Sequence, residues 1–157
     1  MATNLKKITP HLWFNKEAKK AAEFYVSIFP GSKITQVNTI NNTPSGTVEI
    51  VSFELSEQSF MAIGAGPLFK FNESVSFIVH CDTQEEIDYY WNKLTDGGQE
   101  QPCGWLKDKF GLSWQVVPSV MGDMMKNGSN EQIARITSAF LQMKKFDIVA
   151  LQRAYTG

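Results

Sequence analysis

Residues 21–34 read AAEFYVSIFPGSKI, and residues 87–98 read IDYYWNKLTDGG. Both stretches place apolar side chains at helical spacing and then end at a helix-stopping pair, Pro30-Gly31 or Gly97-Gly98. The apolar positions superpose at a constant offset of 66 residues: Ala21, Phe24, Tyr25 and Ile28 correspond to Ile87, Tyr90, Trp91 and Leu94. This self-similarity indicates a duplicated unit built around one amphipathic helix.

Strand patterns surround both predicted helices. Residues alternate between apolar and polar before each helix, over Lys7 to Phe14 and over Val75 to Cys81. After the helices, strands are expected at Lys33–Ile40, Thr47–Leu55 and Ser59–Gly64 in the first copy, and at Trp105–Lys107 and Leu112–Val117 in the second. The predicted fold class is α+β, with one strand–helix–sheet module at about 5–66, a second at about 72–118 and C-terminal helices over 119–157. We expect a single domain over 1–157.

Capping residues predict where the helices begin. Asn15 is expected to cap the first helix, and Thr83 with Glu86 has the spacing of a capping box for the second. Asn130 and Asp147 are the predicted N-caps in the C-terminal region.

Composition excludes some function classes. The 157 residues include 15 basic and 16 acidic residues without a long run of either sign, so a nucleic-acid track is not expected. No stretch approaches the roughly 18 apolar residues of a membrane span. Cys81 and Cys103 fit a reducing compartment, so we expect free thiols in a cytoplasmic protein.

Several stretches carry a family resemblance: ITPHLWF at 8–14, AAEFYVSIFPGSKI at 21–34, GPLFKFNESVSFIVHCDTQEEIDYYW at 66–91, CGWLKDKFGLSWQVVP at 103–118 and MKKFDIVALQRAYTG at 143–157. Together they resemble the PhnB-like, or 3-demethylubiquinone-9 3-methyltransferase-like, family of the vicinal oxygen chelate (VOC; glyoxalase/bleomycin-resistance) superfamily. The resemblance implies paired βαβββ modules whose sheet curls into a cleft, normally completed in a homodimer. It does not imply a reaction.

The resemblance also implies where a metal would bind, on strand faces opposite the helices. Those positions fall near His11, Ser74 or Ser76, and Gln115, and only His11 is a good metal ligand. We therefore predict no complete metal site and no cofactor. His80, at a strand end, could be an added donor or simply a half-exposed polar residue.

The leading hypothesis is a small organic ligand in the cleft of a homodimer, without a nucleic-acid or membrane partner. The predicted ligand-binding residues are His11, Trp13, Ser76, Trp105 and Gln115. One alternative is a metal-dependent lyase, isomerase or dioxygenase in which His11 is a ligand or general base and Gln115 orients the substrate. Another is a structural protein whose cleft is filled by its own side chains. No catalytic residue is assigned.

Three further features have two interpretations each. Trp13, Trp105, Phe69 and Phe71 could form an aromatic wall for a ligand or a dimer interface. Cys103 could be a nucleophile, although a small loop residue is favoured because no Cys–His pairing is readable. Despite the methyltransferase label, neither strand–helix junction contains a glycine-rich loop, so no S-adenosylmethionine site is expected.

Overall fold

The computed structural model describes residues 6–157, and the chain divides into two compact units, Met1–Phe71 and Asn72–Gly157. Each unit is described by itself.

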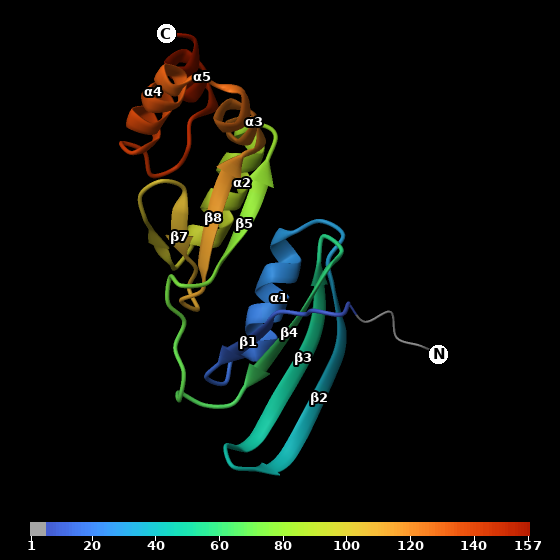
Figure 1. The fold of residues 1–157 in the computed structure, drawn as a ribbon. Coiled ribbons are helices and arrows are strands. Elements are labelled where there is room, and N and C mark those ends of the chain that lie inside the picture. The colour runs from blue at the N-terminus through green and yellow to red at the C-terminus, as the bar shows by residue number, and fades with distance from the viewer. Residues whose placement is uncertain (1–5) are drawn as a thin grey trace. The chain divides into compact units, whose positions relative to one another are not determined.

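Unit 1 is a four-stranded mixed sheet with one helix on it (Figure 1). Along the chain its elements are β1 (His11–Phe14), α1 (Ala18–Ile28), β2 (Lys33–Thr43), β3 (Gly46–Leu55) and β4 (Gln58–Gly64). The strand order is β1-β4-β3-β2, in which β1 and β4 run parallel and the other neighbours are antiparallel. The crossover from β1 through the helix explains the one parallel pair, because parallel strands need a long connection.

The core of unit 1 lies between α1 and one face of this sheet. Tyr25 is fully buried on α1, and its ring stacks on Phe53 of β3 with centroids 6.3 Å apart. Phe53 in turn stacks on Phe60 of β4 at 5.5 Å. Burying each of these side chains contributes roughly 1.5–3 kcal/mol, so this aromatic row holds the helix to the sheet.

Unit 2 repeats the plan. Its elements are β5 (Ser76–Cys81), α2 (Gln84–Thr95), β6 (Gln99–Glu100), β7 (Trp105–Lys107) and β8 (Ser113–Pro118). The strand order β5-β8-β7-β6 matches that of unit 1, again with the first strand parallel to the last. The predicted duplication and the α+β fold class are therefore confirmed.

The core of unit 2 also follows the predicted pattern. Ile87 and Leu94 of α2 are fully buried, and Trp91 and Trp114 are each only 3% exposed. Trp91 lies on the predicted apolar stripe of α2, so this stripe is confirmed as part of the core.

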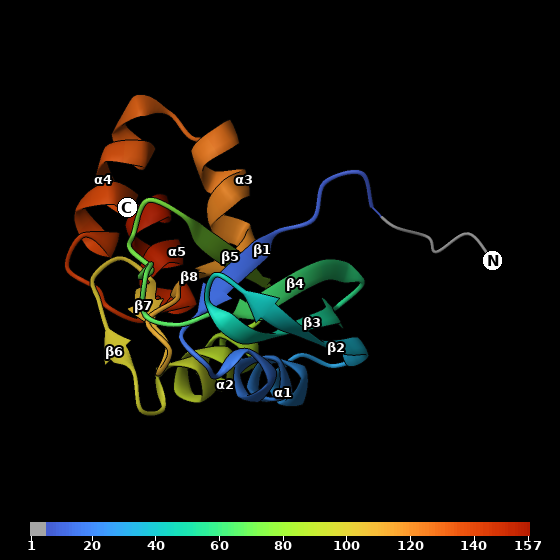
Figure 2. The same cartoon turned by 90° about the horizontal axis from the view of Figure 1, so that it is seen from below.

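Three further helices complete unit 2: α3 (Ser119–Asn127), α4 (Asn130–Phe140) and α5 (Ile148–Thr156). They lie beyond one end of the sheet of unit 2 (Figure 1) and gather next to one another (Figure 2). The segment between α4 and α5 returns to the sheet, where the carbonyl oxygens of Met143 and Lys144 accept hydrogen bonds of 2.8 Å from the Cys103 and Gly104 amides. We call residues 141–147 the return segment. The C-terminal helices are thus tied to the loop that leads into β7.

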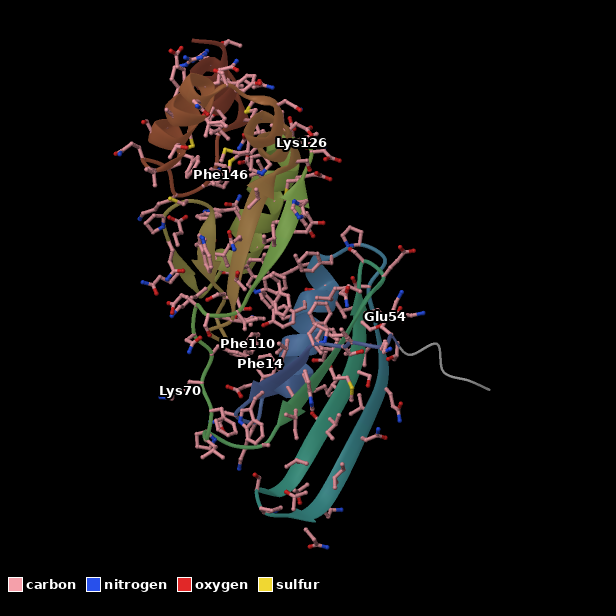
Figure 3. The ribbon with its side chains drawn as sticks, viewed as in Figure 1. Phe14, Glu54, Lys70, Phe110, Lys126 and Phe146 are labelled. Atoms are coloured by element: carbon pink, nitrogen blue, oxygen red, sulfur yellow. The ribbon has the colours of Figure 1, made fainter. Side chains whose placement is uncertain are left out.

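Phe146 anchors the return segment (Figure 3). Its side chain is only 2% exposed and packs edge-to-face on Phe140. A Cβ atom at Gly104 would lie 2.5 Å from the Phe146 ring, so glycine is required there. Gly104 also has a φ of +78°, which a residue with a side chain rarely adopts.

Some strand boundaries differ from the prediction. The first strand begins at His11 rather than Lys7, because residues 7–10 form a bend and an irregular stretch. Val75 was predicted to face the second helix, but it precedes β5 and is 61% exposed. The two-residue strand β6 was not predicted, since two polar residues carry no alternation.

Helix starts were predicted with mixed success. The predicted cap Asn15 is wrong: Glu17 is the N-cap of α1, and its carboxylate accepts from the Lys16 amide instead of closing the helix. Ser129, not Asn130, caps α4 through a complete capping box with Gln132.

The remaining two caps are largely as expected. Thr83 accepts from the Glu86 amide as predicted, but the Glu86 carboxylate returns to the Asp82 amide rather than to that of Thr83. Asp147 accepts from the Ala150 amide, which confirms it as the cap of α5.

Candidate functional site

One face of the unit 2 sheet is left uncovered by α2, and the strand register aligns its side chains in rows. Trp105 on β7 is the partner of Gln115 on β8, which in turn lies opposite Ile78 on β5. The neighbouring row consists of Lys107, Ser113 and Ser76. We call these six residues the open face of unit 2. Because side chains alternate along a strand, all six lie opposite the core residues Trp114 and Val116.

A side-chain hydrogen bond links the two rows. Gln115 Nε2 lies 3.0 Å from Ser76 Oγ, and both side chains are partly buried. A Gln amide and a Ser hydroxyl together have more donors and acceptors than one bond uses. The pair therefore still presents at least one donor and one acceptor, whichever way the amide is oriented.

Ser113 adds a buried hydroxyl beside this pair. Its Oγ atom has no hydrogen-bond partner within residues 6–157. An unpaired buried hydroxyl costs about 1–3 kcal/mol, so the sheet carries an unfavourable group at this position.

An ion pair borders the open face. Lys107 Nζ lies 2.5 Å from Glu73 Oε1. The hydrogen bond from Lys107 lowers the pKa of the Glu73 carboxyl below its usual range, with a smaller contribution from Gln101. The positive charge of Lys107 is thus offset locally.

The corresponding face of unit 1 carries His11 and Trp13, which alternate with the buried Leu12 and Phe14 on β1. His11 is exposed. Trp13 Nε1 donates to the Gly66 carbonyl at 2.9 Å, and its ring meets Phe69 edge-on at 4.9 Å.

The predicted ligand residues thus fall into two groups. Ser76, Trp105 and Gln115 share the open face of unit 2, whereas His11 and Trp13 share a strand face in unit 1. That all five line one cleft stays a prediction.

The predicted aromatic wall is distributed over several contacts. Phe69 contacts Trp13, and Phe71 packs on Phe14 with centroids 5.1 Å apart. Trp105 belongs to unit 2. The ligand wall and the dimer interface both stay predictions.

Asp108 has a larger structural role than its turn position indicated. Its Oδ1 atom accepts from the amides of Phe110 and Leu112 at 2.8 and 3.1 Å, as expected for a carboxylate in a turn. Its Oδ2 atom accepts from Trp114 Nε1 at 2.9 Å, and the residue is only 3% exposed. Asp108 therefore links the turn between β7 and β8 to the indole of a core tryptophan.

The two cysteines are free thiols, as predicted. Burial raises the pKa of Cys81 to about 12, with smaller contributions from Glu86 and Asp82. Cys103 is partly exposed and lies in the loop before β7 with a φ of +62°. The backbone N–H of Cys103 donates a hydrogen bond to the return segment, which explains why a non-glycine residue is held in this conformation.

Comparison with protein families gives one decisive match. Residues 6–117 match the model of the 3-demethylubiquinone-9 3-methyltransferase family. The chain belongs to this PhnB-like family. No curated protein matches the sequence. The match ends at residue 117, before α3 begins, so the three C-terminal helices of this PhnB-like chain lie outside the matched residues.

Solved structures agree with this assignment. A PhnB protein from Bacillus cereus shares 32% identity at a TM-score of 0.66, covering 73% of this chain and 100% of its own. Protein PA1353 from Pseudomonas aeruginosa shares 20% identity at a TM-score of 0.61, with 73% and 98% covered. The fosfomycin resistance protein FosX from Listeria monocytogenes shares 13% identity at a TM-score of 0.56, with 81% and 100% covered. The latter two likenesses show the fold, which is that of the VOC superfamily.

On the open face of unit 2, the donor set of this PhnB-like chain does not fit a divalent metal. Over the described part of the chain, no group of three or more His, Cys, Asp or Glu side chains is placed to hold an ion. On the open face of unit 2, the candidate donors Ser76 and Gln115 are neutral and hydrogen-bonded to each other. A hydroxyl and an amide are weak substitutes for the imidazole and carboxylate ligands of open catalytic sites.

The methyltransferase label also has no matching feature in the sheet topology. A doubly wound cofactor domain has a mostly parallel sheet with a glycine-rich turn after its first strand. Here each sheet has one parallel pair, and residues 14–17 and 80–83 connect strand to helix without glycine.

None of the helices over residues 6–157 is long and apolar enough to cross a membrane.

Proposed function

We propose that this PhnB-like protein binds a small organic molecule on the open face of unit 2 through direct contacts with side chains rather than through a metal ion. The observation that carries the proposal is the Gln115–Ser76 hydrogen bond, which lies in the sheet face beside the partly exposed Trp105. A few polar groups among apolar walls are typical of a small-molecule site.

Neighbouring residues support this proposal. Ile78 is 49% exposed and lies in register with Gln115 on the other side from Trp105. An apolar side chain therefore flanks the polar pair on each side. A ligand laid across the strands would bury both flanks, at roughly 25 cal/mol per Å² of apolar surface removed from water.

A fragment screen by protein NMR tests the proposal, with the backbone amide signals of the open face as the reporter in every variant and the side-chain NH2 signals of Gln115 as a second reporter wherever Gln115 is present. We expect ligands that shift these signals to lose binding in Trp105→Ala and Gln115→Leu. Gln152→Leu is the matched control, since Gln152 is exposed on α5. Fragments that bind wild type, both variants and the control equally would place the ligand elsewhere and overturn the proposal.

Metal analysis tests the metal-free part separately. We expect purified protein to contain far less than one equivalent of zinc, nickel, manganese or iron. A stoichiometric ion that is lost in His11→Ala would instead favour the metal-dependent enzyme.

Two further expectations accompany this function. We propose a cytoplasmic homodimer, which follows from the family resemblance and the thiol content rather than from contacts in the chain. Light scattering at micromolar concentration should give twice the chain mass of 17.7 kDa. A monomeric mass would overturn the dimer.

A further inference from the structure

From the geometry of the open face of unit 2 we infer the chemical class of its ligand: an uncharged planar ring that carries a hydrogen-bond donor and a carbonyl acceptor on adjacent atoms. A cyclic amide edge is the simplest example. This inference rests on the proposed function and concerns the same side chains.

The donor–acceptor requirement follows from the Ser76–Gln115 pair. With Gln115 Nε2 donating to Ser76 Oγ, the Ser76 hydroxyl hydrogen is left to donate and the Gln115 carbonyl oxygen is left to accept. With the amide turned over, Ser76 donates to the Gln115 oxygen, and the Gln115 NH2 group and a Ser76 lone pair remain. Both arrangements offer a neighbouring donor and acceptor. The complementary ligand edge has one of each side by side.

Ser113 supplies an independent observation at the same place. Its buried hydroxyl lies between Lys107 and Ser76 in the register and lacks a partner in the described chain. Because Ser113 is fully buried, its O–H group reaches a ligand carbonyl only when a neighbouring side chain of the open face moves aside. Donation to a second lone pair of that carbonyl would then give the hydroxyl the partner that it lacks. A carbonyl oxygen accepts two such bonds, whereas a ligand N–H group cannot accept any.

The absence of net charge follows from the neighbouring side chains. Trp105, Gln115 and Ile78 form an uncharged row, and the ammonium group of Lys107 is paired with Glu73. A charged ligand would have to give up its hydration without a free counter-charge, which is unfavourable at a partly buried site.

The ring shape follows from the strand spacing. Trp105 and Ile78 are two strands apart, which corresponds to roughly 9–10 Å. A single six-membered ring fits across this width, with its face or edge against the Trp105 indole. An aromatic contact of this kind favours a planar partner.

The test compares two isomers, 2-pyridone and 4-pyridone, by NMR titration of the full chain. The isomers have the same atoms and functional groups, but only 2-pyridone carries N–H and C=O on adjacent ring atoms. We expect 2-pyridone to bind at least tenfold more tightly than 4-pyridone and to shift the Gln115 side-chain signals. Catechol offers an adjacent donor and acceptor without a carbonyl group, so tighter binding of catechol than of 2-pyridone would overturn the carbonyl requirement.

Variants and an anionic probe complete the test. Ser76→Ala and Gln115→Leu should each reduce the preference for 2-pyridone over 4-pyridone to below threefold, whereas Gln152→Leu should leave it unchanged. Equal binding of the two isomers, or tighter binding of benzoate than of 2-pyridone, would overturn this inference. Other fragments that still bind at Trp105 in that case would leave the proposed function standing, so the two failures can be told apart.

Discussion

Replacing Asp108 with alanine should lower the free energy of unfolding by about 4 kcal/mol. The carboxylate accepts three hydrogen bonds, and two of the donors, the Leu112 amide and Trp114 Nε1, are buried. Each buried donor left without a partner costs about 1–3 kcal/mol, which brackets the total at about 2–6 kcal/mol. The third donor, the Phe110 amide, is only part-buried and regains water, so it adds little.

Urea unfolding followed by circular dichroism measures this effect. Asp108→Asn keeps one acceptor oxygen and should cost about half as much, roughly 2 kcal/mol. Asp123→Ala is the matched control, because Asp123 is exposed on α3, and it should change stability by less than about 0.5 kcal/mol.

A double-mutant cycle isolates the indole contact. The combined cost of Asp108→Ala and Trp114→Phe should be smaller than the sum of the single costs by at least about 1 kcal/mol. If Asp108→Ala proves no more destabilising than the Asp123 control, or if the two costs simply add, the buried carboxylate does not hold the hairpin.

Four shorter predictions concern Gly104, the two cysteines and Asp88. Gly104→Ala should destabilise unit 2 by more than about 2 kcal/mol in thermal unfolding, because the methyl group meets a buried ring at a left-handed backbone position; a change within about 0.5 kcal/mol would contradict this. Native protein at pH 8 should expose one reactive thiol, Cys103, and two after denaturation. Burial raises the pKa of Cys81 to about 12, so between about pH 9 and pH 12 the unfolded chain loses the thiol proton and the folded chain keeps it. The free energy of unfolding should therefore fall as pH rises through this range. Cys81→Ala should make this fall in the free energy of unfolding less steep. Lys145→Met should raise the pKa of Asp88, which the ion pair holds below its usual range, and NMR titration below pH 5 should show it; an unchanged pKa would assign the shift to the other partner, Gln84.

Much of the fold was predictable from the sequence, because the two helices carry strong periodic signals. The apolar stripes of α1 and α2 and the alternation of β8 correctly placed Tyr25, Ile87 and Trp114 in the core. Duplication strengthened each signal, since two weak patterns at the same offset are less ambiguous than one.

The errors lie where local chemistry offers equivalent choices. Asn15 and Asn130 are good N-cap residues, but Glu17 is the N-cap of α1 and Ser129 caps α4 through a local capping box with Gln132. Val75 continues the alternation of β5, but β8 begins at Ser113 opposite Ser76, so Val75 has no strand partner.

The candidate site was only partly predictable. Parity along strands placed Ser76, Trp105 and Gln115 on one face, and the register confirms this grouping. Spacing alone could not show the Ser76–Gln115 bond or the unpaired Ser113 hydroxyl, because both depend on side-chain rotamers across two strands.

The return segment also bears on how this gene can be shortened. A stop codon placed where the family match ends, near residue 117, would remove the carbonyls that receive the Cys103 and Gly104 amides. It would also remove the backbone groups at Phe146 and Ile148 that the Gln84 side chain bonds at the start of α2. An expression fragment of unit 2 should therefore begin near Asn72 and keep every residue through α5.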